Sequence, residues 1–138
     1  MEVKKLVSDE EILGSFDLMS ELISIGDESY FLSLVRKKEL CGYSLFGLFD
    51  DGLVSLIGVT FSYYFSSGKI LVINDFVTNK NKRGKGYGGF LFDWIEDFAK
   101  KSGCVEIRLD SSVKRSQAHE FYKNKGMSLV GYEFCKKL

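Results

Sequence analysis

The stretch Ile70 to Lys100 reads ILVINDFVTNK, then NKRGKGYGG, then FLFDWIEDFAK. An apolar segment leads into a basic turn rich in glycine, which opens into a segment with the apolar spacing of an amphipathic helix. Glycine allows a backbone to approach a ligand closely, and the first turn of a helix leaves N–H groups without intrahelical partners at the positive end of the dipole. We therefore predict an anion site in this turn, suited to a phosphate or pyrophosphate.

Two common nucleotide motifs fit the turn less well. A Walker A motif needs Ser or Thr after Gly-Lys, but Gly84-Lys85 is followed by Gly86. The dinucleotide fingerprint G-x-G-x-x-G can be placed on Gly84, Gly86 and Gly89, and the following strand ends in an acidic residue, Asp110. The turn is long for that motif and only one further helix follows, so a dinucleotide-binding fragment stays as the weaker alternative.

A different pattern, Arg-x-x-Gly-x-Gly, fits the run from Arg83 to Gly88. A second block follows: RSQAHEFY, from Arg115 to Tyr122, and then a Lys-Gly-Met step that ends at Met127. In the order and spacing of these two blocks, the sequence resembles the GNAT superfamily of N-acetyltransferases over residues 42–138. A glycine turn that caps a surface helix in an unrelated α/β protein is the alternative interpretation.

The resemblance implies an α/β (α+β) fold with a central mixed sheet, in which an antiparallel meander is followed by parallel, splayed strands four and five. Four helices flank this sheet, and residues 1–138 form a single N-acetyltransferase domain. The patterns of apolar and turn residues predict these elements: strands 3–7, 42–49, 53–65, 69–78, 104–110 and 127–137; a helix capped by Ser8 and ended by Gly26; and helices from Asp27, over 86–101 and over 114–124.

The same resemblance implies acetyl-CoA as cosubstrate and assigns residues to it. The pantetheine arm pairs with the backbone at the end of strand four, which is Phe76, Val77 and Thr78 here. The pyrophosphate is assigned to Arg83 and to the N–H groups from Gly84 through Gly89, namely Gly84, Lys85, Gly86, Tyr87, Gly88 and Gly89. Arg115 stands where the family often has Asn; it could reach the CoA phosphates or cap the end of strand five.

Acetyl transfer to an amine requires a neutral amine and a protonated leaving thiolate, so it calls for a general base and a general acid. By its place four residues after Ala118, Tyr122 matches the acid tyrosine of the family, and a phenol is protonated at neutral pH. Asp75, just before the pantetheine-pairing residues, is the candidate base. The structural alternatives are that Tyr122 packs under the cofactor and that Asp75 is buried and bonded to the backbone.

Composition excludes several classes of function. Nineteen basic residues balance nineteen acidic ones, so no global field favours nucleic acid, and no apolar run is long enough to span a membrane. Three cysteines without paired spacing suggest a reducing compartment, for which the cytoplasm is the default, and with one histidine they predict no metal site. Exposed aromatic residues on the last strands are compatible with a homodimer, which is common in the family.

The sequence thus predicts an N-acetyltransferase that moves an acetyl group from acetyl-CoA to a primary amine of a small molecule or peptide by direct attack. The alternative is a non-catalytic module that binds CoA or acyl-CoA. No motif identifies the amine acceptor.

Overall fold

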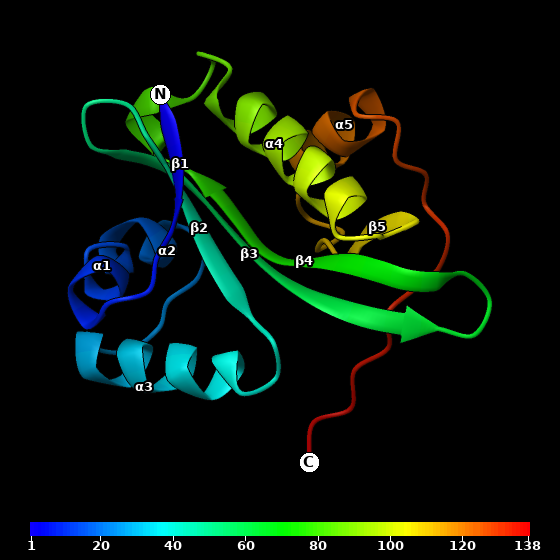
Figure 1. Ribbon diagram of the computed structural model, residues 1–138, viewed down its shortest axis with the longest axis horizontal. Coiled ribbons are helices and arrows are strands. Elements are labelled where there is room, and N and C mark those ends of the chain that lie inside the picture. The colour runs from blue at the N-terminus through cyan, green and yellow to red at the C-terminus, as the bar shows by residue number, and fades with distance from the viewer. The chain divides into compact units, whose positions relative to one another are not determined.

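The computed structural model describes residues 1–138, which form two compact units, Met1–Arg108 and Leu109–Leu138. The elements in chain order are β1 (Glu2–Lys5), α1 (Asp9–Leu13), α2 (Phe16–Leu22), α3 (Glu28–Glu39), β2 (Ser44–Phe49), β3 (Leu53–Tyr64), β4 (Gly68–Thr78), the 3-10 turn η1 (Lys80–Lys82), α4 (Tyr87–Lys101), β5 (Glu106–Leu109) and α5 (Ser116–Asn124) (Figure 1).

The strands form one mixed sheet in the order β1-β2-β3-β4-β5. The pairs β1–β2, β2–β3 and β3–β4 are antiparallel. The last strand, β5, is reached through α4 and runs parallel to β4. The N–H of Val105 donates to the carbonyl of Lys69 at 2.9 Å, so β5 starts beside the start of β4. This arrangement confirms the predicted fold class.

Local sequence chemistry accounts for the junctions between these elements. The capping box predicted at Ser8 and Glu11 is present, because each side chain accepts from the backbone N–H of the other residue. Asp27 caps α3 by accepting from the N–H of Tyr30 at 2.8 Å. In the turn between β2 and β3, Asp51 has a φ of 53°, a left-handed conformation that Asp tolerates better than most residues.

The expected flank of four helices is wrong in number, because five α-helices are present. The first predicted helix is divided into two: α1 ends at Leu13, with Gly14 as its C-cap, and α2 ends at Leu22, before Gly26. At the break, Ser15 is fully buried and its hydroxyl donates to the carbonyl of Ile12 at 2.6 Å. A side chain that bonds locally to the backbone competes with helix continuation, which explains the division.

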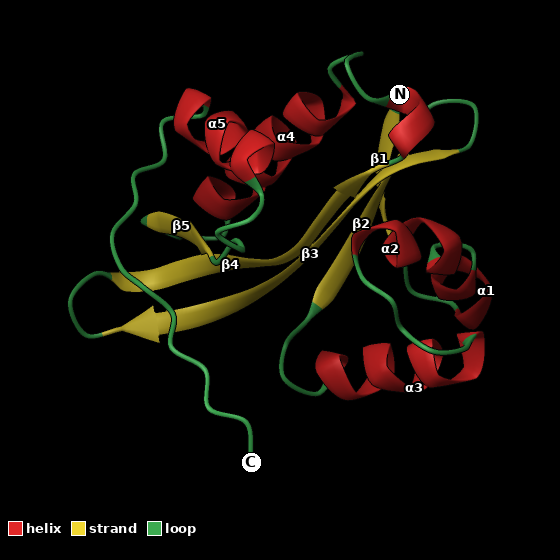
Figure 2. Cartoon of the chain, turned by 180° about the vertical axis from the view of Figure 1, so that it is seen from behind, coloured by secondary structure: helices red, strands yellow, loops and turns green.

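Within the first unit, α1, α2 and α3 lie on one face of the sheet and α4 lies on the other (Figures 1 and 2). On the first face, the core combines apolar residues of the three helices with residues of β2, β3 and β4, among them Leu45, Leu56 and Val77. On the second face, the ring of Phe46 packs against the aromatic side chains of Trp94 and Phe98 at centroid distances of 5.1 and 5.2 Å. Burial on both faces explains the apolar character of the strands.

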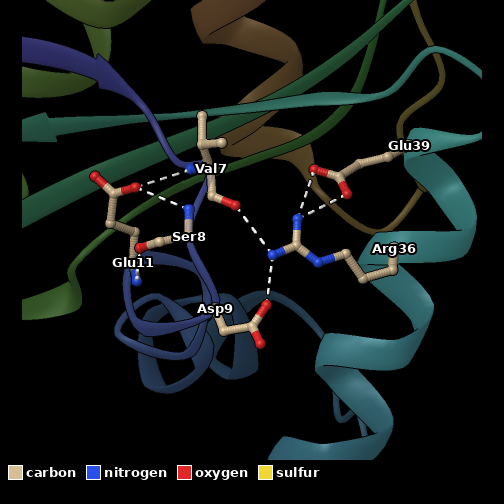
Figure 3. Close-up of polar contacts among 6 residues, drawn as sticks. All are labelled: Val7, Ser8, Asp9, Glu11, Arg36 and Glu39. Carbon is tan, nitrogen blue, oxygen red and sulfur yellow. Dashed lines mark hydrogen bonds and ion pairs between the residues drawn. The ribbon is translucent and has the colours of Figure 1, made fainter.

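Arg36 ties α3 to the start of α1 (Figure 3). Its guanidinium donates to the carbonyl of Val7 at 3.0 Å, to the carboxylate of Asp9, and to both carboxylate oxygens of Glu39 at 2.9 and 3.2 Å. The planar fork of an arginine can serve several acceptors at once, whereas a lysine ammonium is a single point charge. Arg36 therefore helps to hold the helices that cover the first face.

We expect Arg36→Ala to lower the urea concentration at the midpoint of unfolding, since charge-assisted hydrogen bonds are lost from a side chain that is 37% exposed. Equilibrium urea denaturation measures this loss. Lys37→Ala, at the neighbouring exposed position, is the control and should change stability by less than about 0.5 kcal/mol. Equal stability of the two variants would show that the cluster contributes nothing.

The second unit contains α5, and the expected final strand over 127–137 is wrong: no strand is present there. The main-chain N–H of Met127 donates to the carbonyl of Tyr122 at 3.0 Å, and the residues from 128 to 138 are exposed. A strand exists only where its backbone pairs with a neighbour, and apolar or aromatic side chains alone do not supply that pairing. None of the helices has both the length and the apolar character that crossing a bilayer requires.

Candidate functional site

The end of β4 and the glycine turn lie against each other, as the sequence-predicted site requires. The guanidinium Nε of Arg83 donates to the carbonyl of Thr78 at 3.2 Å. A Cβ added to Gly88 would lie 3.2 Å from the hydroxyl oxygen of Thr78, so a side chain there would press on the end of the strand. The turn from Arg83 to Gly89 is therefore seated directly on the last residues of β4.

A buried hydroxyl on the neighbouring strand β3 also fixes the end of β4. Ser55 on β3 is fully buried; its hydroxyl donates to the carbonyl of Val77 at 3.0 Å and lies 2.9 Å from the hydroxyl of Thr78. Because the single proton of Ser55 is given to Val77, Thr78 is the donor in the second bond. The orientation of the Thr78 side chain is thus set by the core of the sheet.

The backbone of the turn presents N–H groups. Gly84 and Gly86 have φ values of 79° and 85°, in the left-handed region that favours glycine, and Gly86 is the N-cap of α4 without a side-chain cap. The N–H groups of Gly84, Lys85 and Gly86 donate no hydrogen bond within the chain, and the first turn of α4 begins at Tyr87. These features match the requirements of an anion site at a helix N-terminus.

Main-chain groups alternate in direction along β4. The N–H of Asn79 donates to the carbonyl of Val54 at 2.9 Å, and Val77 is paired with Leu56, so the main-chain groups of Val77 point toward β3. By alternation, those of Phe76 and Thr78 point toward the opposite edge of β4. The side chain of Phe76 lies on the α4 face, with its ring 6.4 Å from that of Phe92.

Tyr87, predicted as a residue of the cofactor loop, has its phenol engaged elsewhere. Its hydroxyl donates to the carboxylate of Asp50, in the turn between β2 and β3, at 2.6 Å. This bond, more than burial or the negative charge of Asp50, raises the pKa of the phenol above its usual value. The side chain of Tyr87 thus anchors the start of α4 to the sheet, and its backbone remains part of the turn.

Asp75 lies in β4 beside a residue that the sequence patterns did not select. The phenol of Tyr43, a residue between α3 and β2, donates to Oδ2 of Asp75 at 2.6 Å. Tyr43 is buried, and this burial, followed by the charge of Asp75 and the hydrogen bond, raises the pKa of its phenol far above the ordinary value. Tyr43 is therefore a permanent hydrogen-bond donor to the carboxylate.

The sequence carries one signal that points toward Tyr43. Gly58 interrupts the apolar run of β3, and a glycine inside a strand often marks a bulge or a close approach of another group. The group that approaches is the phenol of Tyr43. Nothing in the sequence shows which residue fills the space above Gly58, since Tyr43 is fifteen positions away, between α3 and β2.

Arg115 and Tyr122 lie in the second unit. Arg115 is the N-cap of α5, and Tyr122 lies in the last turns of that helix, where its ring contacts that of Phe121 at a centroid distance of 5.6 Å. Burial raises the pKa of the Tyr122 phenol, and the positive charge of Arg115 lowers it by a smaller amount. The phenol is therefore protonated at neutral pH, as a general acid must be.

Comparison with known proteins identifies the family of this chain. The model of the GNAT acetyltransferase family matches residues 4–127, a wider span at the N-terminus than the two motifs indicated. An uncharacterized N-acetyltransferase of Bacillus subtilis, YhdJ, is 36% identical over 137 residues, which cover 97% of this chain and 96% of that protein. An aminoalkylphosphonate N-acetyltransferase of Salmonella typhimurium is 32% identical over 66 residues, 48% of this chain and 43% of that protein.

Solved structures share the fold at low sequence identity. A ribosomal-protein-alanine N-acetyltransferase from Brucella melitensis has a TM-score of 0.84 at 13% identity, with both chains covered completely. A glucosamine-6-phosphate N-acetyltransferase from Arabidopsis thaliana has a TM-score of 0.77 at 23% identity, over 99% of this chain and 97% of that one. From the family match over nearly its whole length, this chain belongs to the GNAT family of acetyltransferases.

Proposed function

We propose that this protein moves an acetyl group from acetyl-CoA to the primary amine of a small molecule or peptide by direct attack. GNAT enzymes use acetyl-CoA as cosubstrate. The observation that carries the proposal is the glycine turn at the start of α4, in which the main-chain N–H groups of Gly84, Lys85 and Gly86 have no acceptor in the chain and Gly88 lies against the end of β4. A diphosphate bound there would place the thioester arm along that strand.

We assign the diphosphate of CoA to the backbone from Gly84 through Gly89 and to the cationic side chains of Arg83 and Lys85. Arg83 already donates Nε to the carbonyl of Thr78, and its two terminal nitrogens make no contact within the chain, so they can serve a phosphate. For the pantetheine arm, we assign the main-chain groups of Phe76 and Thr78 that point away from β3. Val77 lies between these two residues in the strand. Arg115, in the second unit, is assigned to a CoA phosphate.

The transfer step needs one proton acceptor and one proton donor among the residues of the chain. Asp75, directly or through a water, takes a proton from the amine as its nitrogen bonds to the acetyl carbon. As the carbon–sulfur bond breaks, Tyr122 gives its proton to the departing thiolate. The chain returns to its first state when Asp75 releases its proton to solvent and the Tyr122 phenolate takes one up from solvent. Asp75 lies on the face of β4 where α1–α3 pack. The amine acceptor would therefore reach Asp75 on that side of the sheet.

The names of similar proteins suggest the amines to test. They include an aminoalkylphosphonate N-acetyltransferase, a glucosamine-6-phosphate N-acetyltransferase and an enzyme named for a ribosomal-protein alanine. All three names describe a primary amine, two of them on phosphorylated or phosphonylated small molecules. We therefore propose a panel of 2-aminoethylphosphonate, glucosamine 6-phosphate and a peptide with an N-terminal alanine.

Three further properties complete the proposal. The family model spans residues of both compact units, which supports a single acetyltransferase domain over residues 1–138. The three free cysteines suit a reducing compartment, which supports a cytoplasmic location. Exposed aromatic residues, such as Tyr132 and Phe134, support a homodimer, which size-exclusion chromatography with light scattering would test.

Calorimetry with acetyl-CoA, followed by a thiol-release assay with the amine panel, tests the function. We expect micromolar binding and thiol release with at least one amine. Binding without release from a broadened amine panel would favour the non-catalytic CoA-binding module. Tight binding of NADH without binding of acetyl-CoA would favour the dinucleotide-binding alternative, and absence of both would remove the anion site.

Gly86→Ala tests the turn itself. A side chain at a φ of 85° costs roughly 1–2 kcal/mol, and relaxation of the turn would move N–H groups away from the phosphate position. We expect the Kd for acetyl-CoA to rise about tenfold in calorimetry. Gly103→Ala is the matched control, because Gly103 also has a positive φ, 82°, and open space around it, but lies at the other end of α4. An equal Kd in the two variants would contradict the assignment.

A further inference from the structure

The phenol of Tyr43 reaches its partner across an intervening strand. Tyr43 precedes β2, Asp75 lies in β4, and β3 runs between these two strands in the sheet. The residue of β3 that faces Asp75 in the register is Gly58, and a Cβ added there would lie 1.9 Å from the phenol oxygen. The phenol therefore passes directly over the backbone of Gly58, a route that any side chain would close.

A β-bulge determines which way Asp75 points. Gly58 is paired with Asp75 and the next residue, Val59, with Ile73, so Asn74 is the extra residue in β4. Neighbours in a strand face opposite sides of the sheet, so Asp75 and Ile73 also face opposite sides, although a regular strand would place them on the same side. The bulge thus turns Asp75 toward the face that holds Tyr43.

The surroundings of the pair leave one carboxylate oxygen available. Tyr43 occupies Oδ2 of Asp75, and Oδ1 makes no hydrogen bond or ion pair within the chain. The ammonium of Lys38, on α3, lies 4.6 Å from the centre of the Tyr43 ring and adds a cation–π contact to the hydrogen bond with Asp75. The ring can therefore neither turn away from Asp75 nor leave the core without losing both contacts.

We propose that Tyr43 is a positioning residue for acetyl transfer: its phenol fixes Oδ2 of Asp75 and so directs Oδ1 toward the amine that is to lose its proton. Gly58 supplies the space that this bond requires. The inference rests on the proposed role of Asp75 as the general base. It assigns a function to a residue between α3 and β2, outside the two motifs that carry the cofactor site.

The test is Tyr43→Phe, which removes the hydroxyl and leaves the ring. Without the bond, the Asp75 carboxylate can rotate, so we expect kcat for the fastest amine of the panel to fall about tenfold, while the KM for acetyl-CoA stays within about twofold. Tyr63→Phe, which removes a hydroxyl from a side chain that is 76% exposed, is the matched control and should leave both constants unchanged. A merely structural hydroxyl would lower the melting temperature without this loss of kcat.

The outcomes separate the inference from the proposed function. If Asp75→Asn loses activity and Tyr43→Phe keeps the wild-type kcat, the positioning role is overturned and the base assignment stands. If the wild type releases no thiol with any amine, both are overturned. Should Tyr43→Phe melt below the assay temperature, Asp75→Glu replaces it: moving the carboxylate by one methylene should also lower kcat about tenfold at constant KM, and a wild-type kcat would overturn positioning.

Discussion

Asp75→Asn is expected to lower kcat for acetyl transfer about a hundredfold, while the Kd for acetyl-CoA changes less than about twofold. A positioned general base contributes roughly 10²–10⁴ to a rate, and an amide of the same shape cannot accept the proton of the amine. The amide can still contact the phenol of Tyr43, so the fold is preserved. Steady-state kinetics with saturating acetyl-CoA, paired with calorimetry, measures both constants.

The control for this variant is Asp51→Asn, in the turn between β2 and β3. Asp51 is exposed and has a φ of 53°, a conformation that Asn adopts as readily as Asp, so the same chemical change is made without strain. We expect wild-type kinetics from it. If Asp75→Asn behaved in the same way as this control, the base would have to be another group.

Gly58→Ala is expected to cost about 3 kcal/mol of unfolding free energy, the largest stability effect that we anticipate for a single methyl group in this chain. A Cβ at 1.9 Å from the Tyr43 oxygen cannot coexist with the present ring position. Overpacking a core costs about 1–3 kcal/mol, and losing a hydrogen bond to a carboxylate adds roughly 1.5–3 kcal/mol where the site cannot relax. Equilibrium urea denaturation followed by tyrosine and tryptophan fluorescence gives the value.

Gly131→Ala provides the comparison, because a Cβ at Gly131 meets nothing within 4 Å and its backbone needs no left-handed angle. We expect a change below about 0.5 kcal/mol there. A small loss for Gly58→Ala would mean that Tyr43 moves aside at little cost. In that case, the close packing of the Tyr43 ring over Gly58 would contribute little to the strength of its hydrogen bond with Asp75.

Much of the fold followed from local patterns. The capping box at Ser8 and Glu11, the cap at Asp27 and the turn at Asp51 are interactions between residues three or fewer positions apart, so their chemistry is legible in the chain itself. The division of the first helix depends on Ser15, whose hydroxyl could equally have faced solvent. Only its burial in the core makes the local bond to Ile12 decisive.

The final strand shows the opposite case. Residues 127–137 contain several apolar and aromatic residues, among them Val130, Tyr132 and Phe134, which favours a strand. A strand, however, forms only where two backbones pair. In the structure this segment pairs with no neighbouring strand, so it does not form a strand. The tertiary structure decides this outcome because hydrogen bonds between strands connect residues that are distant in the chain.

By itself, the sequence determined the glycine turn before α4, the strand that leads into it and the family to which they point. These depend on glycine conformation and on the polarity of a helix end, both of which are local properties. Only the tertiary structure decided that Tyr43 reaches Asp75 over Gly58, and that Thr78 is held by Ser55. Each of these contacts joins separate strands or loops through the register of the sheet, and register arises from the packing of the whole core.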